Sequence, residues 1–554
     1  MQSTKAVKFG SVVVTLLLAT VFTVYASGQV TADNNHDAFL TGQSSGNVED
    51  TITKMSTSPM LQLADAHGIT NIMGKDITGS VDSGSLAAQG ADNPVGTDPF
   101  LDENEPSIAA KPNNEAIAVA VSHNFPAPNC VAYRSTDGGE TWSDKKVLPL
   151  VQIDDTCSDP VVRWAPNDGL DPDAETRVYA VYVSIRADLS TSDIAVSYSN
   201  NQGLTWVGPI VAIAGIPEET FLDKPWIATH VNFPGPISTG KVNDKVYVTA
   251  TQFDVFDDCK ILFTRSTNGA VTFSPPKILA SSTGCDPVLQ GSRPAGGPTG
   301  TTGNNVLVCW YNSEADGWLA GVFDIRCRRS GDFGVIFGPQ VSAVNNRAYE
   351  LPFFKCPDAN FERWWFGMMP AIEITRNGVA HIVYAADPTD GADDGECGDI
   401  YYTKSVKPYN KWTPLLLQPK LNDDGDVKAQ GFPTITSKGG PLSVDSILVA
   451  AWVDHRDSAN FGCTGFFDDV QVNCIYDIYY AYTDASWKDH ANRRVTDVSS
   501  FSDAFFAGDY IDSSAHRVAT TPPNALVIWT DRSDKDTVFD LEDNVFSDRV
   551  SLPP

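Results

Sequence analysis

The sequence predicts an all-β fold, a β-propeller of four-stranded antiparallel blades arranged in a ring. Two observations carry this prediction. A turn motif recurs four times between residues 135 and 337, and a short strand with the pattern Pro-x-aliphatic recurs between residues 105 and 513. Motifs that return at a long, fairly steady period indicate a radial repeat architecture. Seven strand repeats favour seven blades, and six blades with one irregular blade remain an alternative.

The turn motif follows the pattern Ser-x-Asp-x-Gly-x-Thr-Trp and is known as an Asp-box. The Asp or Asn accepts backbone N–H bonds across the turn, the Gly takes a positive φ, and the aromatic ring fills the gap between adjacent sheets. The motif therefore builds structure and performs no chemistry. Its copies contribute Ser135, Asp137, Gly139 and Trp142; Ser199, Asn201, Gly203 and Trp206; Ser266, Asn268 and Phe273; Ser330, Asp332, Gly334 and Phe337; and a degraded remnant with Thr483, Asp484 and Trp487.

The strand motif marks the first strand of each predicted blade. A β-rich run follows each copy, and the clear Asp-boxes lie just after third strands, so each unit is predicted to have its box at the turn between strands three and four. The seven copies begin the blades at residues 105–108, 159–162, 224–227, 286–289, 369–372, 432–435 and, without proline, 510–513. A pair of β-sandwiches with coincidental turns is the less favoured alternative.

The residues before the propeller have a different character. Two lysines precede an apolar run at residues 12–24, and small residues follow, so residues 1–26 are predicted to be a signal peptide. An uncleaved anchor is the alternative, since residues 9–26 are close to the minimum length for spanning a bilayer. Residues 27–94 are polar and aperiodic, and we expect a disordered linker or pro-segment that could act as a loose membrane or cell-surface tether. Residues 95–554 form the predicted propeller.

All ten cysteines lie in the predicted propeller, as expected of an exported protein in an oxidising compartment. Cys130 and Cys157 hold the same positions between two blades as Cys259 and Cys285 hold between two later ones. This equivalence predicts two homologous inter-blade disulfides rather than metal ligands. Adjacency along the chain suggests three further pairs, Cys309 with Cys327, Cys356 with Cys397, and Cys463 with Cys474.

The formal net charge of −30 makes nucleic acid an improbable partner, because phosphate binding needs a basic surface. Many acidic residues fall in loops after second strands, on the face of a propeller where ligands normally bind. No cofactor is required, but such oxygen-rich loops could hold Ca²⁺. The best candidate set is Asp387, Asp390, Asp393, Asp394 and Glu396. A solvated acidic surface that keeps the protein soluble is an equally good interpretation.

With these boxes, the chain from about Pro94 to its C-terminus resembles the sialidase superfamily. The resemblance implies a tyrosine nucleophile paired with a glutamate, an aspartate acid/base and three arginines that grip a carboxylate. Tyr510, between Gly508 and Ser513, occupies the place of the nucleophile, with Glu350 as its candidate partner and Asp159 as a candidate acid. The alternatives are a packing role for Tyr510 and a strand-capping role for Asp159.

The chain departs from the family where the first arginine is expected. Asn104 stands there, and Glu105 beside it would repel a substrate carboxylate. Replacement arginines could come from Arg363, Arg456 or Arg532. The last two have aspartate neighbours, so structural ion pairs are the favoured interpretation for each of them.

Three functions are compatible with these observations. The first is a secreted sialidase-like propeller that binds or acts on an extracellular glycan or glycoprotein without ordinary sialidase catalysis. The second is an active exo-sialidase-type glycoside hydrolase with a tyrosine nucleophile. The third is a cell-surface protein-interaction scaffold. Fold alone does not carry function, and one expected arginine is absent, so the first is favoured.

Overall fold

The computed structural model describes most of the chain after residue 91. The described residues are 92–96, 102–112, 114, 116–125, 129–165, 177–230, 244–255, 258–297, 304–313, 322–350, 369–375, 377–386, 398–424, 428–438, 447–458, 475–483, 487, 491–501, 508–515, 524–533 and 543–552. The predicted signal peptide, most of the predicted linker, and the acidic set at residues 387–396 lie outside this part.

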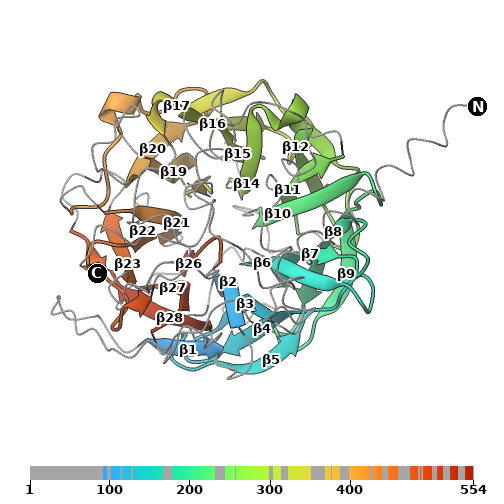
Figure 1. The fold of residues 1–554 in the computed structure, drawn as a ribbon, viewed down its shortest axis with the longest axis horizontal. Coiled ribbons are helices and arrows are strands. Elements are labelled where there is room, and N and C mark those ends of the chain that lie inside the picture. Colours follow the sequence, from blue (N-terminus) through green and yellow to red (C-terminus); the bar gives the residue numbers. More distant parts are fainter. Residues whose placement is uncertain are drawn as a thin grey trace, which may run out of the picture.

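Seven antiparallel sheets form a closed ring, which confirms the predicted propeller and its seven blades (Figure 1). Six of the blades contain strands β2–β5 (Asp102–Ala110, Ala118–Phe125, Asn129–Ser135, Ser143–Val147), β6–β9 (Thr156–Trp164, Val178–Ile185, Ser192–Ser199, Val207–Ile213), β10–β13 (Thr220–Thr229, Val246–Asp254, Cys259–Ser266, Lys277–Ser282), β14–β17 (Val288–Gly296, Val306–Ser313, Val322–Ser330, Val341–Glu350), β18–β20 (Ala371–Ile374, Val379–Ala386, Asp399–Val406) and β21–β25 (Gln430–Lys438, Ile447–Asp454, Ile475–Thr483, Arg493–Arg494, Ser500–Phe501).

The first strand of the chain closes the seventh blade. Strand β1 (Asn93–Gly96) pairs with β28 (Asn544–Ser551), which continues through β27 (Asn524–Asp531) to β26 (Asp512–Ala515). The two ends of the propeller are therefore joined within one sheet. Such closure removes the open sheet edges that would otherwise separate the first and last blades.

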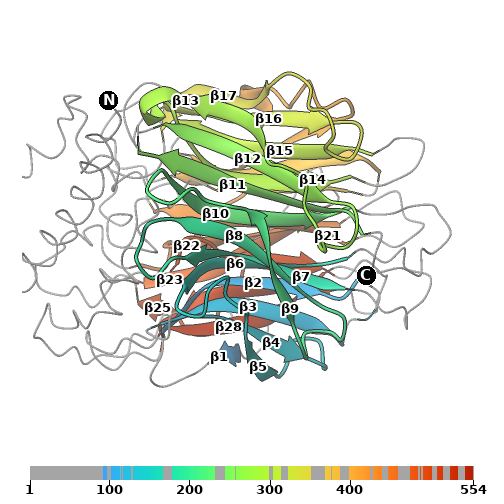
Figure 2. The same ribbon diagram turned by 90° about the vertical axis from the view of Figure 1, so that its right-hand side faces the viewer.

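Burial follows the position of a strand within its blade. Every residue of the second strand β7, an almost unbroken apolar run, is buried, because it is covered by neighbouring sheets on both faces. The outer strand β5, by contrast, consists largely of exposed polar and charged residues. Seen from the side, the strands run along the axis of the ring, so the innermost strands line its centre (Figure 2).

Three second strands carry a fully buried tryptophan. Trp452 donates its indole N–H to Asp454 at 2.7 Å, and Trp529 donates to Asp531 at 3.2 Å, two residues further along in each case. Trp310, in β15, is also fully buried. A buried indole with its N–H satisfied adds a large apolar area without leaving an unpaired donor.

The four clear turn motifs share one hydrogen-bond pattern at the junction of third and fourth strands. In the first, Asp137 Oδ1 accepts from the Thr141 backbone N–H at 2.9 Å, and Ser135 Oγ accepts from the Gly139 N–H at 2.8 Å. Gly139 adopts φ 95°, which only glycine takes without strain. The indole of Trp142 reaches the neighbouring blade, where it donates to Ser547 at 3.0 Å. This turn thus fastens its own blade and contacts the blade that precedes it in the ring.

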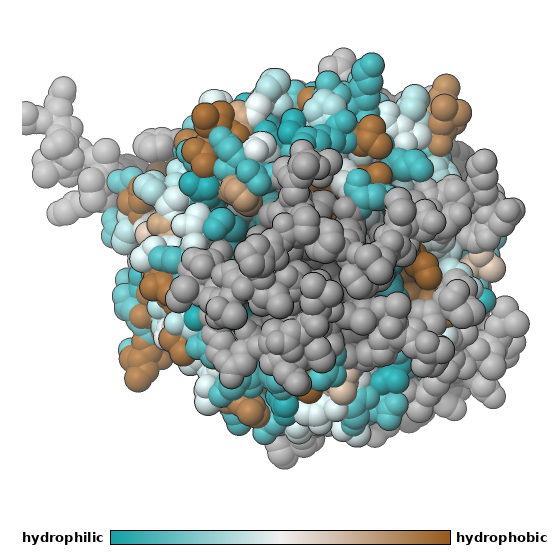
Figure 3. Space-filling view, turned by 180° about the vertical axis from the view of Figure 1, so that it is seen from behind, coloured by the Kyte–Doolittle hydropathy of each residue, from teal (hydrophilic) through white to brown (hydrophobic). Residues whose placement is uncertain are grey.

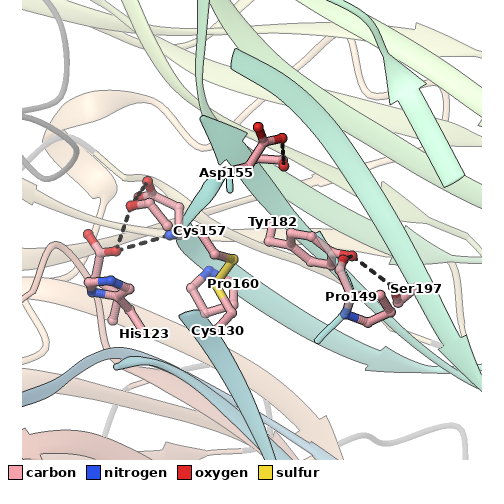
Figure 4. Close-up of a disulfide and its surroundings, with 12 residues drawn as sticks. His123, Cys130, Pro149, Asp155, Cys157, Pro160, Tyr182 and Ser197 are labelled. Atoms are coloured by element: carbon pink, nitrogen blue, oxygen red, sulfur yellow. Dashed lines mark hydrogen bonds between the residues drawn. A yellow bond between two sulfur atoms is a disulfide. The ribbon is translucent and has the colours of Figure 1, made fainter. Parts of the chain in front are cut away.

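The three disulfides of the described residues match the predicted pairs. Cys130–Cys157 and Cys259–Cys285 close loops with sequence separations of 27 and 26, and Cys309–Cys327 joins directly opposed residues of β15 and β16. Around the first of them, Tyr182 hydrogen-bonds to Ser197 at 2.8 Å (Figure 4). The other predicted pairs, Cys356–Cys397 and Cys463–Cys474, lie outside the described residues. Disulfides of this kind fit an oxidising compartment.

The surface of the described residues alternates between polar and apolar groups. From behind, hydrophobic residues are scattered among hydrophilic ones around the rim (Figure 3). Within the described ranges, no helix is long and apolar enough to cross a bilayer.

Candidate functional site

A repeated β-bulge shapes the innermost strands of five blades. In β2, for example, the register with β3 shifts between Asn104 and Ser107, and the residue within the bulge, Glu105, has φ 51°. The corresponding bulge residues of the other four blades also have positive φ: Asp159 (51°), Lys224 (47°), Gly291 (64°) and Phe432 (47°). Bulges re-aim side chains, and strained backbone of this kind is often found at functional sites.

The fourth blade corrects one prediction from the sequence. Its first strand was expected at residues 286–289, but Asp286 is exposed and follows a short 3-10 helix, η2 (Thr283–Cys285), before β14 begins. The bulge in β14 lies between Gln290 and Arg293 instead. The Asp-Pro pair resembles the first-strand motif, but the conformation of this strand comes from Gly291. Sequence reasoning therefore missed Arg293.

Three buried carboxylates meet around one ammonium group at the centre of the ring, and we call this arrangement the carboxylate cluster. Oxygens of Glu105, Asp159 and Asp509 lie within 4.8 Å of one another, and all three side chains are buried. Lys224 Nζ lies 2.5 Å from Asp159 Oδ1 and 3.5 Å from Glu105 Oε1, and it also contacts Asp509. Burial, and then the charge of Glu105, raise the pKa of Asp159.

Backbone groups hold the cluster in place. Glu105 Oε2 accepts from the Asp159 backbone N–H at 3.1 Å. Gly508 packs so closely that a Cβ there would lie 2.8 Å from the Glu105 backbone nitrogen, so a larger residue would displace the cluster. The oxygen spacing alone would suit a divalent cation, but the ammonium of Lys224 already occupies the place between the same oxygens. The cluster does not fit a second cation.

The candidate nucleophile, Tyr510, lies beside the cluster and is almost fully buried. Its hydroxyl donates to the backbone carbonyl of Pro160 at 3.0 Å, and its ring packs edge-on against Trp226 with centroids 5.4 Å apart. Burial, followed by the charges of Glu105 and Asp159, raises its pKa well above the ordinary value. Among the described residues, no carboxylate hydrogen-bonds to this hydroxyl. Glu350, its predicted partner, is the last residue of β17, and its side chain lies outside the described part.

Two of the predicted substrate-binding arginines are held by aspartates. Arg456 Nη1 lies 2.7 Å from Asp423 Oδ1 and its Nη2 lies 2.8 Å from Asp454 Oδ2. Burial alone would lower the pKa of Arg456, but the neighbouring aspartates raise it. Arg532 is fully buried, with its Nε 2.7 Å from Asp543 Oδ1. Arg363 lies outside the described residues.

Where the family places its first arginine, Asn104 hydrogen-bonds instead to the imidazole of His123, with Oδ1 3.2 Å from Nδ1. Burial lowers the pKa of His123 to about 3, so this imidazole is neutral at physiological pH. The pair is buried and polar, and it provides no positive charge for an anionic ligand.

Beyond the bulges, the inner strands carry two arginines that the sequence analysis did not single out. Arg163 forms a two-point ion pair with Asp512, at 2.6 and 3.1 Å. The Arg293 guanidinium stacks on Trp226, with Cζ 3.7 Å from the ring centroid. The local signal for Arg293 was the glycine two residues before it, which marks the bulge. No local signal pairs Arg163 with Asp512, which lies 349 positions away.

These residues line a cavity on the axis of the ring, which we call the inner-channel cavity. Its volume is about 110 Å³, and it extends from Arg163, Trp226 and Arg293 along the ends of the inner strands. It thus lies toward the turns that connect first and second strands, away from the face where the sequence placed the ligand. Its other walls include Glu373, Thr434, Ser437 and Ser513. On the scale of buried waters, the volume suits a small polar molecule.

The sequence matches no protein-family model, and no curated protein matches it. Similar solved structures include an α-L-arabinofuranosidase of Fusarium graminearum in complex with an iminosugar inhibitor (12% identity, TM-score 0.39, covering 83% of this chain and 97% of that one) and an α-L-arabinanase of Penicillium chrysogenum complexed with arabinobiose (11%, 0.40, 86% and 99%). A Trypanosoma rangeli sialidase is also similar (13%, 0.37, 74% and 55%). Likenesses this distant carry no argument about activity or ligand.

Proposed function

We propose that this protein is a secreted, sialidase-like propeller that binds extracellular glycans, free or on glycoproteins, without ordinary sialidase catalysis. The observation that carries the proposal is the inner-channel cavity, where polar side chains line the space beside the Trp226–Arg293 stack. Small-molecule sites combine an apolar or aromatic lining with a few polar side chains that fix the orientation of the ligand. Thr434 and Ser513 supply hydroxyls, which hydrogen-bond to each other at 3.0 Å.

The surroundings of the candidate catalytic groups support binding over hydrolysis. A tyrosine nucleophile needs a base that accepts its proton, whereas the hydroxyl of Tyr510 is bonded to a carbonyl and its pKa is raised. Asp159, the candidate acid, is bonded to Lys224 and has no exposed surface. Asn104 replaces the family arginine and binds His123. Each of these candidate groups is therefore held by a different partner within the folded chain.

The proposed cellular setting is outside the cell or at its surface. The predicted signal peptide and linker favour export with a loose surface tether, and the three disulfides fit that destination. Calcium binding by the acidic set at residues 387–396 stays a prediction from the sequence. Calorimetry on chelated protein would contradict it by showing neither a heat of binding nor a change in melting temperature.

The test combines binding with turnover. The secreted protein should bind members of a glycan array, and it should release no fluorophore from a fluorogenic sialoside or from neutral glycosides. The Tyr510→Phe variant should bind the same glycans with the same affinity. Sialoside cleavage that disappears in Tyr510→Phe would establish the hydrolase alternative. Binding of a protein partner without any glycan would instead establish the scaffold.

A further inference from the structure

Arg293 is a buried cation, and within the described ranges no carboxylate is bonded to it. The residue is 3% exposed, and no described residue accepts a hydrogen bond from its Nε. Its described contacts are the face of Trp226 and Met369 Sδ, which lies 3.9 Å from Nη2. Burial lowers its pKa to about 9, so the guanidinium is still protonated at neutral pH. An uncompensated buried charge is costly, and an anion in the cavity would remove that cost.

The carboxylate whose charge acts on Arg293, that of Asp512, is already bonded to other donors. Its Oδ2 accepts from Arg163 at 2.6 Å and from Ser107 at 2.6 Å, and its Oδ1 accepts from Arg163 at 3.1 Å and from the Ser513 backbone N–H at 2.9 Å. Arg163 and Asp512 therefore neutralise each other. The positive charge that remains on this part of the cavity wall belongs to Arg293.

The geometry of Arg293 suits a planar anion. Its guanidinium carbon lies 3.7 Å from the centroid of the Trp226 ring, and a guanidinium placed over a ring can still donate hydrogen bonds in its own plane. Two parallel N–H groups of an arginine match the two oxygens of a carboxylate. Trp226 also restricts the side-chain rotamer, so less conformational entropy is lost when the ligand binds.

The cavity has an anionic wall as well, which orients a ligand. Glu373 lies two residues beyond the start of β18, and its Oε1 accepts from Ser437 at 2.8 Å. A ligand carboxylate near Glu373 would be repelled, whereas sugar hydroxyls can donate to it. The carboxylate end of a ligand therefore belongs at Arg293, and the hydroxyl-rich end extends toward Glu373, Thr434 and Ser513.

We propose that the inner-channel cavity binds a sugar residue that bears a carboxylate, with the carboxylate paired to the guanidinium of Arg293. This inference rests on the proposed function, because it names the ligand class of the same cavity. The proposed site lies at the bulges and ends of the inner strands, not in the acidic loops that follow second strands.

The experiment measures binding of four probes to the full secreted chain by calorimetry. Methyl glucuronide and methyl glucoside differ only at C6, N-acetylneuraminate is a larger acidic sugar, and inorganic sulfate is an anion without a sugar ring. Wild-type protein should bind the glucuronide about 10- to 100-fold more tightly than the glucoside, as expected of a charge-assisted hydrogen-bonded pair. Arg293→Gln should remove this difference, and Arg293→Lys should retain part of it.

The matched control is Arg493→Gln, which removes an arginine that also stacks on an aromatic ring, Tyr482, but in the outer strand β24. It should leave all affinities unchanged. If Arg293→Gln does not fold, the wild-type preference for glucuronide over glucoside still decides the matter. Equal binding of glucuronide and glucoside would overturn the inference and leave the proposed function standing. Binding of no sugar at all would overturn both, and tighter binding of inorganic sulfate than of either acid would overturn the carboxylate assignment.

Discussion

Replacing Lys224 by methionine should strongly destabilise the propeller, because three carboxylates would lose their shared counter-ion. The ammonium lies 2.5 Å from Asp159 and 3.5 Å from Glu105 and also contacts Asp509, all at side chains with almost no exposed surface. Removing one partner of a buried ion pair costs about 3–5 kcal/mol. Because whole domains are stable by only about 5–15 kcal/mol, Lys224→Met should lower the free energy of unfolding by about a fifth or more.

Urea unfolding at pH 5 and at pH 8 measures this loss and its cause. A protonated carboxyl needs no counter-ion. A carboxyl whose pKa is higher in the folded than in the unfolded protein destabilises the folded state only where the pH lies above its unfolded pKa. Lys224→Met should therefore be less destabilised at pH 5 than at pH 8. The control is Lys260→Met, whose ammonium lies 2.9 Å from Asp254 at a partly exposed site and should contribute less than about 1 kcal/mol. Equal losses for both variants, or no dependence on pH, would refute this account of the cluster.

Two further predictions concern stability. At the seam between β1 and β28, burial and the neighbouring Asp497 raise the pKa of Asp92 to about 9, so the melting temperature should fall as the pH rises from 5 to 8. Asp92→Asn should reduce that fall in a calorimetric scan, and an unchanged pH profile would contradict it. The double variant Cys130→Ser/Cys157→Ser removes a cross-link with a sequence separation of 27 and should cost about 3 kcal/mol in urea unfolding. A midpoint equal to that of the wild-type protein would show that the cross-link does not constrain the unfolded chain.

The features predicted correctly from the sequence are those encoded by residues close together in the chain. The turn motif spans eight residues, and its hydrogen bonds, such as that from Thr141 N–H to Asp137, join positions four apart. Equivalent cysteine positions in the repeat also predicted the two inter-blade disulfides, because each pair joins segments that are close together in the chain. Local periodicity also predicted the second strands and the number of blades.

The register of the fourth blade shows where local patterns mislead. Asp286-Pro287 resembles the other first-strand motifs, but those motifs mark a bulge, and here the bulge is supplied by Gly291. The structural requirement is a positive φ at one position, which glycine meets as well as the repeated Xaa-Pro pair does. An Asp-Pro pair therefore does not by itself locate the bulge, because glycine can provide the same backbone conformation.

The sequence alone was sufficient for the turns, the strand repeats, the three observed cross-links and the predicted ring, because each depends on residues within one or two blades. The charges that meet at the centre could be known only from the folded ring. Arg163 pairs with Asp512 across 349 positions, because closing the ring places the last blade beside the first and makes all inner strands converge on one axis. That convergence joins Lys224 to carboxylates from the inner segments of three other blades. It places Arg293 at the cavity, where none of the described carboxylates is bonded to it.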